Sequence, residues 1–192
     1  MKSVFLAALA FSACVITPAS AVTVLGATTL AGPTYNRPLG GAPPTTLSGV
    51  GTAVHYQVTP FTVSASGSYT FLMTAILPAG WDTFLGLHST AFLPASALTN
   101  AIVYNDDFPS IGLSGFSANL LVGVSYFAVA SGFENTDVGT YSLAINGPGN
   151  VNVGGGGQGA VPEPTTWAML LAGFGIVGSA LRRRRRASAA FA

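Results

Sequence analysis

Charged side chains are scarce in this sequence, where only 7% of residues are Asp, Glu, Lys or Arg. Between residues 22 and 160 the only cation is Arg37, against five acidic residues, so this stretch has a net charge of −4. A nucleic acid or an anionic lipid surface attracts clusters of basic side chains, and this stretch has none. The sequence therefore predicts no nucleic-acid partner.

Cysteine and histidine are almost missing as well. The one cysteine, Cys14, lies in an apolar run near the N-terminus, and the two histidines are His55 and His88. A chain that has lost this run has no disulfide and no thiolate metal site. Nothing in the spacing of the two histidines brings them together.

Catalytic motifs are missing from the same stretch. It has no Gly-x-Ser-x-Gly elbow and no P-loop lysine, and nothing selects two of its acids as a glycosidase pair. We therefore predict a protein that is not an enzyme and that has no organic cofactor. A hydrolase is the disfavoured alternative.

The first 21 residues have the layout of a secretory signal peptide. Lys2 precedes an apolar run over residues 4–16, and the small residues Ala19 and Ala21 follow. We predict export through the Sec machinery and cleavage by signal peptidase after Ala21. The residues before Cys14 faintly resemble a lipoprotein box, but Phe11 stands where leucine is usual.

Residues 161–186 combine three unlike parts in a fixed order. Pro162, Glu163 and Pro164 form a triplet that a helix cannot cross. Residues 165–181 contain no charge, and as a helix they would be about 25 Å long, at the lower limit for a transmembrane helix. The third part is a run of five arginines: Arg182, Arg183, Arg184, Arg185 and Arg186.

The arginine run predicts the orientation of this segment. By the positive-inside rule it is a stop on the cytoplasmic side, with residues 187–192 as a cytoplasmic tail and the residues before Pro162 outside. A buried C-terminal helix with a basic end is the disfavoured alternative.

This order of parts resembles the PEP-CTERM sorting signal of Gram-negative bacteria. The resemblance extends to Trp167-Ala-Met after the triplet and to Leu170-Leu-Ala-Gly-Phe-Gly175 before the arginines. It implies an exported precursor, anchored in the inner membrane, whose Pro-Glu-Pro triplet is recognised by an exosortase-type membrane enzyme. The product would then reach the cell surface or the extracellular matrix. Such proteins often accompany exopolysaccharide and biofilm production.

The residues between the two signals predict an all-β fold. In one run Tyr69, Phe71 and Met73 alternate with Thr70, Leu72 and Thr74, which is the period of a pleated strand. Seven such runs separated by turns predict a small β-sandwich or jelly roll of seven to eight strands over residues 53–147. The runs are 54–63, 68–77, 83–88, 101–105, 112–121, 125–130 and 140–146.

Two flanking stretches look poorly ordered from their composition. Residues 22–52 are rich in Gly, Pro and Thr and predict a loose leading segment, with one strand at most near residues 22–25. Residues 148–160 contain little apolar surface to bury and predict a flexible Gly-rich linker.

Short motifs within residues 66–147 resemble a bacterial pre-peptidase C-terminal domain. The motifs are Gly67-Ser-Tyr-Thr-Phe71, Trp81-Asp-Thr-Phe-Leu85, Tyr104-Asn-Asp-Asp107, Gly123-Val-Ser-Tyr-Phe127 and Gly139-Thr-Tyr-Ser-Leu143. Such domains are small β-sandwiches attached to many secreted proteins. The resemblance implies an accessory role without catalysis. Together with the sorting signal, we predict a structural or adhesive role outside the cell, with extracellular polysaccharide as a partner.

The acidic residues supply one candidate metal site. Asp106 and Asp107, with Asp82 and Glu134 or Asp137, could provide oxygen ligands for Ca²⁺, which takes 6–8 of them. The spacing is not that of an EF-hand. An Asx-rich turn, in which the carboxylates close backbone hydrogen bonds, is the favoured alternative.

Four aromatic residues suggest a second kind of site. Trp81, Tyr104, Tyr126 and Phe133 could form a surface on which a sugar stacks, although aromatic residues in strands more often lie in the core. A calcium-dependent carbohydrate- or protein-binding module is therefore the alternative to a purely structural role.

Overall fold

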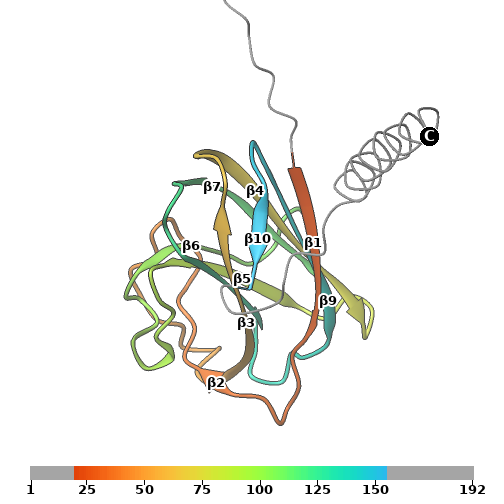
Figure 1. Cartoon of the computed structure of the whole chain (residues 1–192). Coiled ribbons are helices and arrows are strands. Elements are labelled where there is room, and N and C mark those ends of the chain that lie inside the picture. The colour runs from red at the N-terminus through yellow and green to blue at the C-terminus, as the bar shows by residue number, and fades with distance from the viewer. Residues whose placement is uncertain (1–19, 155–192) are drawn as a thin grey trace, which may run out of the picture. The chain divides into compact units, whose positions relative to one another are not determined.

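The computed structural model describes residues 20–154. Within that range the chain is almost entirely β (Figure 1). The elements are β1 (Ser20–Ala27), β2 (Thr34–Tyr35), β3 (Val54–Val63), β4 (Gly67–Leu77), β5 (Thr83–Ser89), the short 3-10 helix η1 (Pro94–Ser96), β6 (Ala101–Asn105), β7 (Leu113–Leu120), β8 (Tyr126–Gly132), β9 (Thr140–Gly147) and β10 (Val151–Val153). The predicted membrane helix at 165–181, the sorting triplet and the arginine run lie outside the described residues. No helix among residues 20–154 is long and apolar enough to cross a membrane.

The strands form two antiparallel sheets, which confirms the predicted β-sandwich. The smaller sheet has the order β1-β9-β4-β7, and the larger has the order β10-β3-β8-β5-β6. Strand β2 pairs with the start of β3, on the edge whose far end pairs with β10. All seven predicted strands are present, each within two residues of its expected ends.

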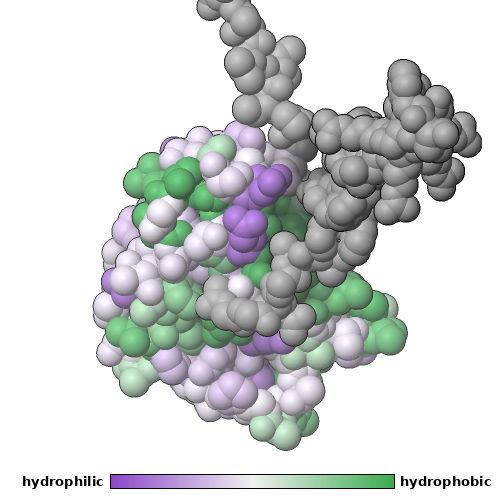
Figure 2. Space-filling view, viewed as in Figure 1, coloured by the Kyte–Doolittle hydropathy of each residue, from purple (hydrophilic) through white to green (hydrophobic). Residues whose placement is uncertain are grey.

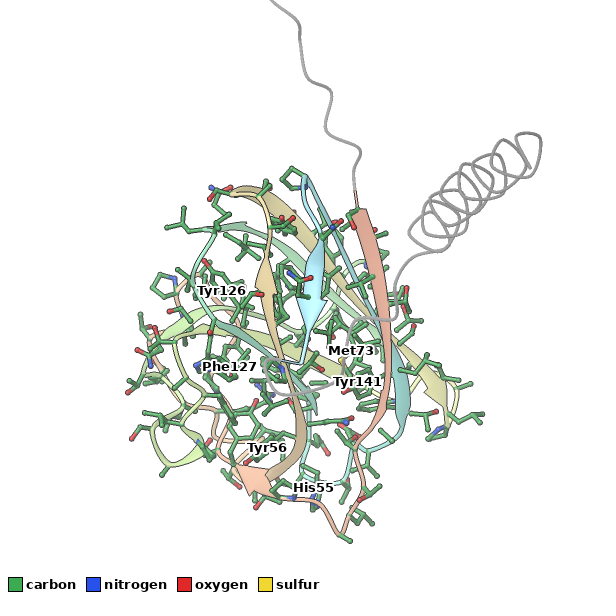
Figure 3. All side chains as sticks on the ribbon, viewed as in Figure 1. His55, Tyr56, Met73, Tyr126, Phe127 and Tyr141 are labelled. Atoms are coloured by element: carbon green, nitrogen blue, oxygen red, sulfur yellow. The ribbon has the colours of Figure 1, made fainter. Side chains whose placement is uncertain are left out.

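The main core lies between the two sheets. On β4 the alternation of Tyr69, Phe71 and Met73 sends all three side chains inward. They meet Tyr141 and other residues of β9, and the inward residues of β3, β5 and β8 close the cluster from the other sheet. Figure 3 labels Met73 and Tyr141, whose side chains are fully buried. Most of its side chains are apolar, and the buried hydroxyls of Thr83 and Ser114 pair with each other at 2.7 Å.

A second buried layer covers the outer face of the larger sheet. Six consecutive residues of β5, from Thr83 to His88, are buried, because both faces of this strand are covered. Phe84 and Tyr104 belong to this second cluster, together with Tyr35 from the leading segment. The cover comes from residues 28–53 and from the loop that contains η1.

The prediction of a loose leading segment over residues 22–52 was therefore wrong. The whole of β1 pairs with β9, from Ser20 with Gly147 to Ala27 with Thr140. Arg37 is 1% exposed, and its Nε atom donates a hydrogen bond of 2.9 Å to the carbonyl of Phe133. The segment is ordered because it covers apolar surface that β5 and β8 would otherwise expose, a tertiary effect that composition does not reveal.

The predicted linker over residues 148–160 also begins too early. Residues 151–153 form β10, which pairs with Phe61 to Val63 of β3. Gly154 then donates a hydrogen bond from its N–H to the carbonyl of Pro60. The domain therefore extends from residue 20 to residue 154, rather than from 53 to 147. The rest of the predicted linker lies outside the described residues.

The start of β1 bears on the predicted signal cleavage. Ala21 pairs with Asn146, so cleavage after Ala21 would leave six of the eight residues of β1, Val22 to Ala27, in the mature chain. Val22 and Val24 pack against the main core, so this remainder keeps its apolar contacts.

Candidate functional site

An acidic cluster forms where two neighbouring strands meet at one end of the larger sheet. Asp82 directly precedes β5, and Asp106 and Asp107 directly follow β6. Because β5 and β6 are antiparallel, with Leu85 opposite Asn105, the start of one strand lies beside the end of the other. The sheet register thus joins carboxylates that are 24 residues apart in the sequence.

The three carboxylates are close enough to share one cation. Each offers one oxygen, and these oxygens lie within 4.8 Å of one another. Two oxygens that both bind Ca²⁺ at about 2.4 Å can be at most about 4.8 Å apart. The cluster therefore fits a single calcium ion, with further ligands to come from second carboxylate oxygens, backbone carbonyls or water.

Two oxygens of this cluster lack hydrogen-bond partners. The Oδ1 atoms of Asp82 and Asp106 are both buried and unpartnered within the described residues. An Asx-rich turn would use such oxygens to accept backbone N–H groups. The turn therefore does not account for them, and a buried acceptor without a partner costs about 1–3 kcal/mol. A cation is one partner that would satisfy both.

Other side-chain oxygens nearby do accept backbone N–H groups. The Oδ2 atom of Asp137 accepts a hydrogen bond of 2.7 Å from the N–H of Glu134, and the Oδ1 atom of Asn105 accepts one from Gly115. Asp137 thus matches the Asx-turn interpretation, whereas Asp82 and Asp106 do not. Neither Glu134 nor Asp137 belongs to the group of carboxylates within cation reach.

The pKa values of the cluster show that it lacks compensating positive charge. Burial, reinforced by Asp106 and Asp107, raises the pKa of Asp82 to about 6. Burial and the charge of Asp107 also raise the pKa of Asp106. Asp82 and Asp106 therefore resist ionisation, and a divalent cation held beside them would reverse that effect.

Arg37, the one Lys or Arg among residues 20–154, lies close to this cluster, a position that the sequence did not predict. Its guanidinium lies over the rings of Phe84 and Phe133, with its carbon 4.0 Å and 4.4 Å from the two ring centroids. Burial lowers its pKa, and the charges of Asp106 and Asp82 counteract that shift. Its Nη2 atom has no hydrogen-bond partner in the described part of the chain. Arg37 therefore compensates the cluster in part, from within the outer layer.

A fourth unpartnered atom lies next to Arg37 in the sequence. The Oδ1 atom of Asn36 is buried without a partner, like those of Asp82 and Asp106. The sequence offered one indication that Asn36 matters: it directly precedes Arg37, the only cation between residues 22 and 160. Without the fold, however, nothing connected residue 36 with residues 82 and 106.

The candidate sugar-stacking surface was wrong for most of its members. Trp81, Tyr104 and Tyr126 are buried, at 6%, 1% and 3% exposure, and Phe133 is half-buried beneath Arg37. Trp81 donates its Nε1–H to the carbonyl of Thr140. These aromatic residues belong to the two buried layers, as the alternative interpretation had it.

The histidines are structural as well. His88 is buried, and its ring nitrogens lie 3.0 Å from the carbonyl of Thr99 and 2.7 Å from the hydroxyl of Tyr104. His55 forms a hydrogen bond of 3.0 Å with the carbonyl of Gly32. Within residues 20–154 neither ring is bonded to a serine or a carboxylate, so neither has the partners of a catalytic dyad.

Comparison with known proteins identifies the C-terminal signal. Residues 160–186 match the family described as the PEP-CTERM protein-sorting motif. The chain therefore carries a sorting signal of this type, which implies export and processing by an exosortase-type membrane enzyme. The predicted motif residues, Pro162, Glu163 and Pro164, fall inside the match.

Solved structures offer two β-domains with low similarity. One is the CBM35 from Cellvibrio japonicus Abf62, at 14% identity and a TM-score of 0.33, covering 71% of this chain and 100% of that one. The other is the K1 cleaved adhesin domain of Lys-gingipain from Porphyromonas gingivalis W83, at 14% identity and a TM-score of 0.29, covering 71% of this chain and 99% of that one. Among curated proteins, none matches the chain in sequence.

Proposed function

We propose that this protein is an exported binding module, not an enzyme, that acts at the cell surface or in the extracellular matrix and holds a calcium ion between Asp82, Asp106 and Asp107. One observation carries the molecular role: three carboxylates from two strand ends lie within 4.8 Å of one another, and two of their buried oxygens have no partner. In this proposal calcium fixes the turn after β6 against the start of β5. The module thereby presents an ordered surface to a matrix polysaccharide or protein, in a structural or adhesive role.

The low charge of the domain supports this role. With one cation among residues 22–160, the domain offers little attraction to polyanions, and most residues on the face shown in Figure 2 are pale or hydrophobic rather than strongly hydrophilic. A divalent ion at the acidic cluster lowers the negative charge of the domain. Calcium sites of extracellular modules typically bind with a Kd of roughly 10⁻⁴–10⁻³ M. We expect an affinity in that range for this site.

The calcium site is tested by thermal unfolding of the full-length protein in calcium and in EDTA. For a Kd in that range, about 5 mM Ca²⁺ should stabilise the wild type by about 1–2 kcal/mol and raise its Tm. Asp106→Asn should remove most of this rise, because it takes a charged ligand from the cluster. Glu134→Gln is the matched control, since it removes one negative charge from an exposed residue outside the cluster.

Two results would contradict the calcium site. One is an equal Tm in calcium and EDTA for the wild type. The other is an equal loss of the calcium response in Asp106→Asn and Glu134→Gln, because that would indicate a general charge effect. Magnesium at the same concentration should stabilise less, since it demands tighter octahedral geometry than three protein carboxylates provide.

Delivery has its own test. In this proposal Pro162, Glu163 and Pro164 are the residues that the exosortase-type enzyme reads. Replacing all three with alanine should leave the precursor unprocessed in the inner-membrane fraction of the native cells, as followed by cell fractionation and by mass spectrometry of the C-terminus. Normal processing and surface delivery of this variant would exclude the triplet as the recognition sequence.

A further inference from the structure

A groove lies on the smaller sheet, and the exposed residues Thr70, Ser117 and Asn146 in its lining place it on the outer face. It has a volume of about 410 Å³, within the range of about 300–1,000 Å³ found for ligand pockets. Its lining comes from β4, β7 and β9 and from the turn after β6: Thr70, Phe71, Leu72, Phe108, Phe116, Ser117 and Asn146.

The sheet register sorts these residues into two parallel rows. Thr70 lies opposite Ser117 of β7 on one side and opposite Asn146 of β9 on the other, and all three are exposed. Leu72, two residues along β4, lies between Gly115 and Ala144 in the same way. One row therefore offers two hydroxyls and a carboxamide, and the next row is apolar.

Phe108 forms an aromatic wall beside the apolar row. Phe108 is 58% exposed, and its ring lies beside Gly115. A Cβ atom added at Gly115 would lie 2.7 Å from the carbonyl oxygen of Phe71 and 3.2 Å from the Phe108 ring. The missing side chain therefore leaves room for the neighbouring strand and for the Phe108 ring beside the sheet.

The chemistry of this lining fits one kind of ligand. A sugar ring has C–H groups on its faces, which stack on an aromatic or aliphatic surface, and hydroxyls on its rim, which pair with hydroxyl and amide groups. No charged side chain lines the groove, so nothing in it favours an acidic or a basic ligand. The two polar hydroxyls and the carboxamide also set it apart from a purely apolar groove for a lipid chain.

We infer that this groove binds a neutral saccharide chain, with Phe108 as the stacking surface and Thr70, Ser117 and Asn146 as the polar contacts. The inference deepens the proposed function, on which one part of it rests: Phe108 follows Asp106 and Asp107 in the same turn, so an ion held by these carboxylates also holds the aromatic wall. The N–H of Phe108 donates a hydrogen bond of 2.7 Å to the carbonyl of Leu113, which ties the turn to the start of β7. Calcium should therefore strengthen saccharide binding without touching the saccharide.

The test is calorimetric titration of the full-length protein in a detergent that contains no sugar, with cellohexaose, mannohexaose and N-acetylchitohexaose as neutral probes and hexagalacturonate as the acidic comparison. At least one neutral hexaose should bind in 5 mM Ca²⁺, and more weakly in EDTA. Phe108→Ala should weaken that binding about tenfold or more, and Asn146→Ala should weaken it less. The matched control is Leu25→Ala, which removes an exposed leucine (73%) from β1 of the same sheet, outside the groove. A Tm for each variant checks that it is folded.

The possible failures can be told apart. If the melting experiment shows no calcium site, but a hexaose binds equally in both buffers and Phe108→Ala abolishes the binding, the groove stands and the calcium coupling falls. If calcium raises the Tm but no neutral hexaose binds, or Phe108→Ala and Leu25→Ala behave alike, the groove assignment is wrong and the calcium site stands. Self-association that Phe108→Ala abolishes, without saccharide binding, would replace the saccharide with a second copy of the chain.

Discussion

The two buried layers of this domain differ in what they bury. The layer between the sheets buries mostly apolar side chains, such as Tyr69, Phe71 and Met73. The buried hydroxyls of Thr83 and Ser114 within it pair with each other. The layer outside the larger sheet instead encloses basic side chains, Arg37 and His88, and it borders the acidic cluster. Apolar packing tolerates no unpaired charge, so the inner layer serves stability. The outer layer is where uncompensated charge, and with it a candidate function, can reside.

The largest expected effect is a loss of stability that leaves calcium binding unchanged. Leu143→Ala removes a fully buried side chain of the inner layer and should lower the free energy of unfolding by about 2–5 kcal/mol, since the cavity adds to the lost burial. Chemical denaturation measures this change. The calcium-induced stabilisation of the folded variant should equal that of the wild type, because no residue of the acidic cluster is altered. A reduced calcium response would mean that the two layers are coupled.

A substitution in the outer layer should lower the stability of the domain and raise its affinity for calcium. Arg37→Met keeps much of the packing on Phe84 and Phe133 but loses the hydrogen bonds to the carbonyls of Phe133 and Pro38. We expect a loss of about 2–3 kcal/mol in the free energy of unfolding. The same change removes the cation nearest the carboxylates, so calcium should bind more tightly. Calcium titrations followed by Tm measure whether the variant binds calcium more tightly or more weakly than the wild type. Weaker binding would contradict the proposal that Arg37 partly neutralises the carboxylates.

The smallest expected effect is a pH dependence of the calcium-free protein. Because the folded state raises the pKa of Asp82 from 3.8 to about 6, it binds more protons than the unfolded state between these values. The contribution of Asp82 to stability is therefore lost as the pH rises from about 4 to about 6, opposite to the usual behaviour of a paired aspartate. The Tm of the wild type minus that of Asp82→Asn, measured in EDTA, should fall across this window. A difference that rises with pH would show that Asp82 is well compensated.

With calcium present the same titration acts on the site. Protons compete with the metal for the carboxylates, so calcium affinity should decline as the pH falls below about 6. The gain in Tm from calcium should then be smaller at pH 5 than at pH 7.

Much of the fold was accessible from residue patterns. The alternation in β4 and the turn residues between runs located seven strands. Successive side chains of a strand point to opposite faces, so a strand with one buried face alternates apolar and polar residues. Strands β2 and β10 were missed and β1 was underrated, since two or three residues beside Gly and Pro carry no periodicity of their own. These strands form because neighbouring edges offer hydrogen-bond partners and apolar surface, which only the assembled sheets provide.

The candidate site was also accessible in part. Asp82, Asp106 and Asp107 were named from their acidity and from the turns that contain them, and the register of β5 against β6 brings all three together. The sequence did not indicate Arg37 or Asn36, because their approach depends on how a Gly- and Pro-rich segment crosses a sheet. The sequence also could not identify Phe108 as the exposed aromatic residue of the groove, since the exposure of each ring depends on which other segments cover it.

The sequence by itself determined the sorting signal, the all-β class and the period of each long strand, because these depend on local order, composition and alternation. The tertiary structure alone decided that residues 22–52 belong to the domain, that two carboxylate oxygens are buried without partners, and that a polar row lies beside an exposed aromatic ring. The physical reason is that burial, and with it the cost of a charge or an unpaired oxygen, is set by contacts between segments far apart in the chain.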